Sequence, residues 1–185
     1  MVVGERIRLF CALRLPDATL DELERWQRRD LLPEPRPGGR LVPRENLHVT
    51  LAFLGSQPAG AVPAVARELG AAAGALGAPI RLATARYRET RSVGMVVLDD
   101  AGGAATALAD DLRLRLERLE LLRPEDRPWV PHVTVVRFRE RPRLQPPLPA
   151  LGEISPSDAA VYSSVLRPGG AQYAVLEALA LRVSG

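Results

Sequence analysis

The chain has 185 residues, of which 46% are hydrophobic and 25% are charged, a composition typical of compact globular proteins rather than disordered or fibrous ones. A chain of this length can bury a core large enough to fold without disulfides or structural metals. The formal net charge is +3, and all 25 basic residues are arginine. This mild excess favours a partner with a few phosphates over a long nucleic-acid duplex.

The apolar segments argue against the secreted and membrane classes. Arg6, Arg8 and Arg14 interrupt the first apolar stretch, so we expect no signal peptide. No apolar run reaches the roughly 18 residues that a membrane span needs. The only cysteine, Cys11, lies in the apolar run 7–15 and is expected to be a core residue. We therefore expect a cytoplasmic protein.

The first half of the chain alternates strands with helices. Thr19 and Glu22 form a capping box, which we expect to open the first helix. The predicted elements are a strand over 6–13, a helix that ends before Pro33, a loop over 33–39, strands over 40–42 and 47–54 around a turn, and a helix over about 59–76. Within the strand 47–54, one face is expected to carry Leu47, Val49, Leu51 and Phe53.

The second half adds more strands and the most regular helix. The predicted elements are strands over 80–87 and 93–98, a helix over 104–122, a strand over 133–138, a proline-rich loop over 140–149, and a hairpin of strands 158–166 and 172–181. The helix carries one apolar stripe, formed by Leu108, Leu112, Leu116 and Leu119. Because hairpins and helices mix, the sequence predicts an α+β fold. No glycine-rich phosphate loop follows any predicted strand.

The only two histidines of the chain occur in matching motifs, His48-Val49-Thr50-Leu51 and His132-Val133-Thr134-Val135. Only 6 of the 185 residues are threonine. The chance that both histidines carry threonine at the second following position is therefore roughly one in a thousand. Alternate strand residues point to the same face, so each histidine and its threonine are expected to emerge together while the valine between them faces the core.

Two such units, 84 residues apart, indicate two related lobes that face each other. If the two strands lie side by side, two imidazoles and two hydroxyls converge on one cleft. The hydroxyls can donate hydrogen bonds to anionic oxygens, and the imidazoles, both expected to titrate near 6.5, can exchange protons. Cleavage of a phosphodiester needs both a base and an acid, so this set of side chains favours phosphodiester chemistry.

Other interpretations of the two motifs remain open from the residues alone. Both histidines could be polar residues on exposed strand faces. A zinc site is a further alternative, although the spacing lacks the His-Glu or Cys pattern of zinc proteins. A serine hydrolase is a weaker alternative, because no serine lies in a strand-to-helix elbow. A nucleotide-binding module that uses the same cleft without turnover is an alternative of another class.

Four segments, RLFCALRLP, PRENLHVTLAFLG, PHVTVVRF and PGGAQYAVL, resemble the bacterial and archaeal RNA 2',3'-cyclic phosphodiesterases, also called 2'-5' RNA ligases, of the two-histidine phosphoesterase superfamily. The resemblance runs from Arg8 to Leu181. It implies a bilobal α+β fold, in which two pseudo-symmetric lobes, each with an antiparallel sheet and helices packed outside, enclose the active cleft. It also implies hydrolysis of a terminal 2',3'-cyclic phosphate to a 2'-phosphate without metal or ATP, and a reverse 2'-5' ligation of tRNA halves.

The resemblance assigns roles to individual residues. It implies that His48 is the proton donor and that His132 is the proton acceptor. It also implies that Thr50 and Thr134 bind the phosphate oxygens. Arg137 matches a phosphate-contacting basic residue of the family.

Arg137 lies five positions after His132, which is the wrong parity for the same face of a regular strand. A bulge or the end of the strand must therefore reorient it. Phe53 and Phe138 are candidates for stacking on a nucleobase, although Phe53 shares the parity of the core face. The family usually carries basic or aromatic residues around the first motif, whereas this chain has Ala52 there.

We therefore expect a single two-lobed phosphodiesterase domain over 1–185, without a cofactor or metal. The expected partners are RNA ends or nucleotides that carry a 2',3'-cyclic phosphate, with tRNA halves as one candidate. We expect a monomer.

Overall fold

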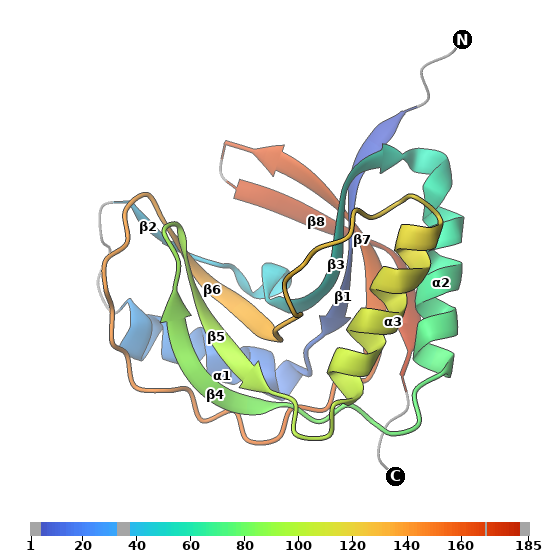
Figure 1. Ribbon diagram of the computed structural model, residues 1–185. Coiled ribbons are helices and arrows are strands. Elements are labelled where there is room, and N and C mark those ends of the chain that lie inside the picture. Colours follow the sequence, from blue (N-terminus) through green and yellow to red (C-terminus); the bar gives the residue numbers. More distant parts are fainter. Residues whose placement is uncertain (1–4, 33–37, 169, 182–185) are drawn as a thin grey trace.

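The computed structural model of the protein describes residues 5–32, 38–168 and 170–181 (Figure 1). Most of the predicted loop over 33–39, and Gly169 of the predicted hairpin turn, lie outside the described residues. The helices are α1 (Asp17–Trp26), α2 (Val62–Gly74) and α3 (Ala104–Arg118), with a π-helical turn η1 (Gln27–Leu31) and the 3-10 turns η2 (Arg44–Asn46) and η3 (Ala59–Ala61). The strands are β1 (Arg6–Arg14), β2 (Gly39–Leu41), β3 (His48–Pro58), β4 (Ala83–Glu89), β5 (Val93–Asp99), β6 (His132–Phe138), β7 (Asp158–Arg167) and β8 (Gly170–Ala180).

The strands form one curled antiparallel sheet in the order β4-β5-β6-β3-β1-β7-β8, with β2 paired to β6. The predicted α+β class is confirmed. The two halves of the sheet, β4-β5-β6 and β3-β1-β7-β8, meet at β3 and β6, where Val49 pairs with Val133. The antiparallel strands of the two expected lobes are thus continuous, joined by a single residue pair that brings the two histidine motifs side by side.

Each half of the sheet is covered by helices on its outer side (Figure 1). Helices α2 and α3 pack on each other and on β3, β7 and β8. Helix α1 and turn η1 cover the other half, where the Trp26 ring lies 6.3 Å from that of Tyr87. The buried Gln27 side chain donates hydrogen bonds to the carbonyls of Val42 and Val135, at 3.0 and 2.7 Å. Because α1 follows β1 in the chain but covers the opposite half, it ties the two halves together.

The predicted elements occur in the predicted order. The helix expected over about 59–76 is the 3-10 turn η3 followed by α2, which ends at Gly74, and the other two helices also differ at one end. Helix α1 begins at Asp17 after Pro16 and has no side-chain cap, so the capping box is wrong: Thr19 is buried inside the helix. Proline is tolerated at this N-cap position, where Pro16 has φ −57° and ψ 148°, because no intrahelical hydrogen bond needs the N–H group that it lacks. Helix α3 ends at Arg118, which leaves Leu119 41% exposed, whereas the other three leucines of the predicted stripe are fully buried.

Strand β6 contains a bulge before Arg137. Its register with β5 pairs Thr134 with Met95 and Val136 with Gly94, so Val135 is an extra residue. Val135 and Val136 are both buried, and the alternation of faces reverses after them. Arg137 therefore points to the same side of the sheet as His132 and Thr134, and of the two expected explanations, a bulge or the end of the strand, the structure contains the bulge.

Strand β3 contains the same irregularity. Its register with β1 pairs Thr50 with Ala12 and Ala52 with Cys11, so Leu51 is the extra residue. As a result Phe53 does not lie on the core face, and the prediction that it shares a face with Leu51 is wrong: the Phe53 side chain is 51% exposed.

Cys11 is fully buried, as predicted, and this burial raises the pKa of its thiol to about 12. A thiol with so high a pKa stays protonated and unreactive at neutral pH. None of the described helices is long and apolar enough to cross a membrane.

Candidate active site

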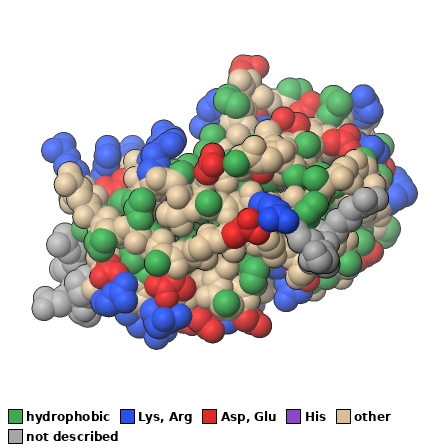
Figure 2. All heavy atoms as spheres, turned by 90° about the horizontal axis from the view of Figure 1, so that it is seen from below, with side chains coloured by type: hydrophobic (Ala, Val, Ile, Leu, Met, Phe, Trp, Pro, Cys, Tyr) green, Lys and Arg blue, Asp and Glu red, His purple; other side chains and the backbone are tan. Residues whose placement is uncertain are grey.

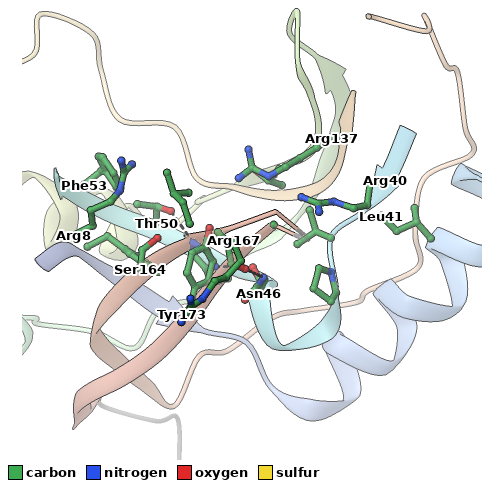
Figure 3. A pocket seen from close by; sticks show the side chains of 18 of the residues that line it. Arg8, Arg40, Leu41, Asn46, Thr50, Phe53, Arg137, Ser164, Arg167 and Tyr173 are labelled. Atoms are coloured by element: carbon green, nitrogen blue, oxygen red, sulfur yellow. Dashed lines mark hydrogen bonds between the residues drawn. The ribbon is translucent and has the colours of Figure 1, made fainter. Parts of the chain in front are cut away.

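The His–Thr faces of β3 and β6 line a cleft of about 780 Å³ on the inner side of the curled sheet. The cleft brings together six of the seven candidate residues, all except Phe138: His48, Thr50, Phe53, His132, Thr134 and Arg137. Figure 3 shows this cleft with further side chains from β1, β2, β7 and β8 around it. The arrangement that the tandem motif predicts, four side chains converging from two adjacent strands, is present.

The antiparallel pairing of the two motif strands gives the cleft two different ends. Phe53 and Arg137 each lie four residues beyond the Val49–Val133 pair, in opposite directions. Their Cα atoms therefore lie on opposite sides of that pair. In Figure 3 Phe53 lies at one side of the pocket and Arg137 at the other. The His–Thr pairs lie between an aromatic end and a basic end.

Both imidazoles are oriented by the same backbone contact. Nδ1 of His48 lies 2.8 Å from the carbonyl oxygen of Asn46, and Nδ1 of His132 lies 2.8 Å from that of Val130. A carbonyl can only accept a hydrogen bond, so Nδ1 carries the proton in both rings and donates it. Nε2 is then the nitrogen left for chemistry in each histidine. In His48 it lies 3.0 Å from the hydroxyl oxygen of Thr50.

His48 is held in an aromatic environment. The ring centroids of Phe10, Tyr162 and Tyr173 lie 5.0, 6.1 and 5.5 Å from that of its imidazole. This burial is the main reason why the pKa of His48 falls to about 4. The hydrogen bond to the Asn46 carbonyl opposes the shift, and the positive charges of His132 and Arg137 add to it. The expectation that both histidines titrate near 6.5 is therefore wrong for His48.

The cleft is strongly basic. Four arginines line it, Arg8, Arg40, Arg137 and Arg167, and no Asp or Glu is among the described residues that do so. By contrast, acidic and basic side chains are interspersed on the face of the molecule in Figure 2. Clustered guanidinium groups without carboxylates attract anions, so the cleft is suited to a phosphorylated ligand.

Two of these arginines form a matched pair. Arg40 of β2 lies directly opposite Arg137 of β6 in the antiparallel register. Two guanidinium groups at such positions suit an anionic ligand that contacts both. The guanidinium of Arg40 also packs on Gly170, where an added Cβ would lie within 2.6–2.8 Å of it. Any side chain at Gly170 would displace that guanidinium.

The turn between β7 and β8 reaches across to the first motif. The side chain of Asn46 donates a hydrogen bond from Nδ2 to the backbone carbonyl of Ala171 at 2.9 Å. The backbone carbonyl of Asn46 accepts the Nδ1 proton of His48. Tyr173 of β8 adds its ring to the cleft wall. One short segment before the first motif therefore connects the hairpin to the orientation of His48.

Sequence reasoning missed several residues of the cleft. Those that line it without having been predicted include Phe10, Arg8, Arg40, Asn46, Ser164, Arg167 and Tyr173. The alternation of faces along β1 could have predicted that Arg8 and Phe10 point away from the core, because they alternate with the buried Leu9 and Cys11. Tyr173 lies in the segment PGGAQYAVL, which carries part of the family resemblance, but no strand pattern placed it or the residues of β7 in the cleft, because they reach it through the curl of the sheet. Phe138 is 8% exposed and belongs to the core, so its expected contact with a nucleobase is wrong.

The described residues contain no group of three or more His, Cys, Asp or Glu side chains that could hold a metal ion. Among the described residues that line the cleft, His48 and His132 are the only members of this set.

Comparison with known proteins identifies relatives of similar length. The chain is 34% identical over 187 aligned positions to the RNA 2',3'-cyclic phosphodiesterase of Thermus thermophilus, a match that covers 95% of this chain and 91% of the relative. The crystal structure of the Thermus thermophilus protein TT0787 superposes with a TM-score of 0.78 at 31% identity, covering 95% of this chain and 98% of that one. Escherichia coli LigT in complex with 3'-AMP superposes with a TM-score of 0.76 at 26% identity, covering 96% and 99%.

The family model described as the 2'-5' RNA ligase superfamily matches residues 15–164, which include both histidine motifs. The match spans most of the chain, and the relatives above agree with it over nearly their whole length. The chain therefore belongs to the 2'-5' RNA ligase superfamily.

Proposed function

We propose that this protein is an RNA 2',3'-cyclic phosphodiesterase, which hydrolyses the cyclic phosphate at an RNA end to a 2'-phosphate. The observation that carries the proposal is the pair of His–Thr units that face one cleft with four arginines around them. The relative from Thermus thermophilus that bears this name supports the same activity. That Escherichia coli LigT binds 3'-AMP supports a nucleotide as the ligand.

The proposed reaction divides proton transfer between the two histidines. Nε2 of His132 takes a proton from water as the water oxygen attacks phosphorus. The bond between phosphorus and the ribose 3'-oxygen breaks, and Nε2 of His48 donates a proton to that oxygen. The product keeps its phosphate on the 2'-oxygen. Acid and base catalysis of this kind contributes about 10²- to 10⁴-fold for each positioned group.

The remaining site residues bind the reacting phosphate. The hydroxyls of Thr50 and Thr134 donate hydrogen bonds to its non-bridging oxygens, and Arg137 offsets the negative charge that grows at phosphorus. The exposed ring of Phe53 offers a surface on which the terminal base can stack.

His48 must carry a proton to act as the acid, yet burial holds its pKa near 4 in the empty cleft. An anionic phosphate within hydrogen-bonding distance favours the protonated imidazole and raises its pKa. We therefore propose that His48 takes up its proton together with the substrate. His48 is then in its acid form only when the phosphate on which it acts is bound.

Several broader features belong to the same proposal. The chain acts as a single two-lobed domain and a monomer in the cytoplasm, without metal or cofactor. In the ligation reaction, the 5'-hydroxyl of a second RNA replaces water as the nucleophile and attacks the cyclic phosphate. The same bond to the 3'-oxygen breaks, and a 2'-5' linkage forms. Two tRNA halves are candidate substrates for that ligation.

Turnover tests the proposal directly. An oligoribonucleotide with a 2',3'-cyclic phosphate end is incubated with the protein, and the expected product is the same oligonucleotide with a 2'-phosphate. Cyclic-phosphate and 5'-hydroxyl halves supplied together test for the 2'-5' joined product. If micromolar protein yields neither product but still binds the oligonucleotide, the cleft belongs to a non-catalytic binding module.

A further inference from the structure

The cleft contains more positive charge than one reacting phosphate requires. A cyclic phosphodiester carries a single negative charge, which Arg137 and the two threonines can bind. Arg8, Arg40 and Arg167 also line the cleft, and no carboxylate is among the described residues that line it. A basic surface in excess of one charge is suited to a ligand with more than one phosphate.

Arg8 lies at the end of the cleft away from Arg137. Its guanidinium carbon is 5.4 Å from the centroid of the Phe53 ring, a distance typical of a cation–π contact. Phe53 and Arg137 lie at opposite ends of the paired motif strands. A single phosphate group cannot bridge these ends, so Arg8 is available for a different group of the ligand.

Arg8 has a hydroxyl beside it. In the pairing of β1 with β7, Arg8 lies directly opposite Ser164, and both residues line the cleft. Figure 3 shows Arg8, Phe53 and Ser164 grouped at one side of the pocket. Ser164 is 8% exposed, so its position is set by packing, and the stack on Phe53 holds Arg8 in place. A fixed guanidinium next to a hydroxyl offers several donors to phosphate oxygens.

We propose that Arg8 and Ser164 form a second phosphate-binding subsite, which holds the phosphate that links the terminal nucleotide of the substrate to the nucleotide before it. The inference rests on the proposed function, because the reacting cyclic phosphate occupies the His–Thr centre. The terminal base stacks on the face of the Phe53 ring that Arg8 does not cover, and the chain then leaves the cleft past Arg8. The subsite makes the protein select an RNA chain over a cyclic mononucleotide.

The test compares three substrates: a cyclic mononucleotide, a dinucleotide with a cyclic phosphate end, and the same dinucleotide with an uncharged methylphosphonate linkage. The third substrate keeps the extra base and removes the charge of the linking phosphate. For the unaltered protein, kcat/KM is expected to be about tenfold higher for the charged dinucleotide than for the methylphosphonate. Arg8→Gln should reduce this ratio to nearly one, and Arg8→Lys should retain part of it.

Arg6→Gln is the matched control. Arg6 lies on the same strand, outside the cleft lining, with its guanidinium bonded to the Ser56 hydroxyl and carbonyl at 3.1 and 2.6 Å. It should leave the substrate ratio unchanged. The rate with the charged dinucleotide should also fall less steeply with salt in Arg8→Gln, by about 0.7 in the logarithmic slope, as expected for the loss of one contact to a single strand.

The subsite proposal is overturned if Arg8→Gln lowers kcat/KM equally for all three substrates, or if Arg6→Gln changes the ratio as much as Arg8→Gln. A protein that turns over none of the substrates contradicts the proposed function instead. In that case the affinities of the charged and uncharged dinucleotides, each ending in an unreactive 3'-phosphate, test the subsite by the same ratio. Equal affinities would then contradict it.

Discussion

Strand β3 from His48 to Leu54 and strand β6 from His132 to Phe138 have the same order of buried and exposed side chains. In each strand the threonine is followed by a bulge, and in each the histidine Nδ1 donates to the carbonyl two residues earlier. The two strands thus share the His-Val-Thr motif, the bulge after the threonine and the tautomer of the imidazole.

The surroundings of the two motifs differ. His48 is packed among Phe10, Tyr162 and Tyr173, which come from the neighbouring strands β1, β7 and β8. No comparable ring contact occurs at His132 among the described residues. The fifth residue after each histidine also differs, because Phe53 in β3 corresponds to Arg137 in β6.

This difference shows how one local design serves two purposes. The repeated backbone presents an imidazole and a hydroxyl from each strand, and the neighbours decide the protonation of each imidazole. Burial lowers the pKa of His48, so its charge depends on what occupies the cleft. The two unlike residues at the fifth position make one end of the cleft aromatic and the other basic.

Removing either histidine should lower kcat/KM more than any other change, and the two variants should respond differently to the leaving group. His48→Ala and His132→Ala are each expected to lower kcat/KM by about 10²- to 10⁴-fold with an RNA substrate. A substrate with a nitrophenolate leaving group needs little help from an acid. With it, His48→Ala should recover much of its lost rate, and His132→Ala should not.

Rates of both variants with both substrates provide the measurement, and unchanged thermal unfolding serves as the folding control. The opposite pattern of recovery would mean that His48 is the base and His132 the acid. The unaltered protein should show a bell-shaped dependence of kcat/KM on pH, whose two limbs belong to the coupled pair.

Substitutions of Phe53 and Arg137, the fifth residues after the two histidines, should affect different kinetic constants. Arg137→Ala is expected to lower kcat by roughly 10²-fold or more, because a guanidinium stabilises the charge that develops at phosphorus. Phe53→Leu should mainly raise KM, by about fivefold or more, since the stacking surface that it removes is worth about 1–3 kcal/mol per base. Arg139→Ala, two residues further on and outside the cleft lining, is the control. An unchanged rate for Arg137→Ala would make this arginine a solvated surface residue.

Anion binding should report the protonation of His48. Since burial holds its pKa near 4, His48 is neutral at pH 7 in the empty cleft, and a bound dianion favours its protonated form. Binding therefore takes up a proton, and affinity should rise as pH falls from 7 towards 4, by up to about tenfold per pH unit. Sulfate suits this measurement because its charge stays constant over the range. Calorimetry in buffers of different ionisation enthalpy would count the protons, and His48→Asn should reduce the uptake.

Much of this site could be predicted from the sequence, because its central side chains come from two short motifs of consecutive residues. The His-Val-Thr spacing predicts which side chains share a face. The odd position of Arg137 predicts a bulge or the end of the strand, and β6 contains the bulge. The same bulge in β3 would have placed Phe53 on the cleft face, since β3 repeats the pattern of β6.

The aromatic environment of His48 could not have been predicted in the same way. Tyr162 and Tyr173 reach it from strands that are more than 100 residues away in the chain. Their contact depends on the curl of the sheet, which no local pattern encodes. The capping box failed for a different reason, since Pro16 starts the helix before Thr19 could cap it.

A chelator should have the smallest effect of all. A metal ion held between the two Nε2 atoms would make the motifs equivalent ligands and would remove the division into acid and base. The cleft offers only two histidines and, among its described lining residues, no carboxylate to complete a coordination shell, whereas catalytic zinc uses three protein ligands. We therefore expect kcat/KM to stay unchanged after incubation with excess EDTA and after dialysis. Loss of activity that added zinc restores would contradict the two-histidine mechanism and would assign both histidines to the metal.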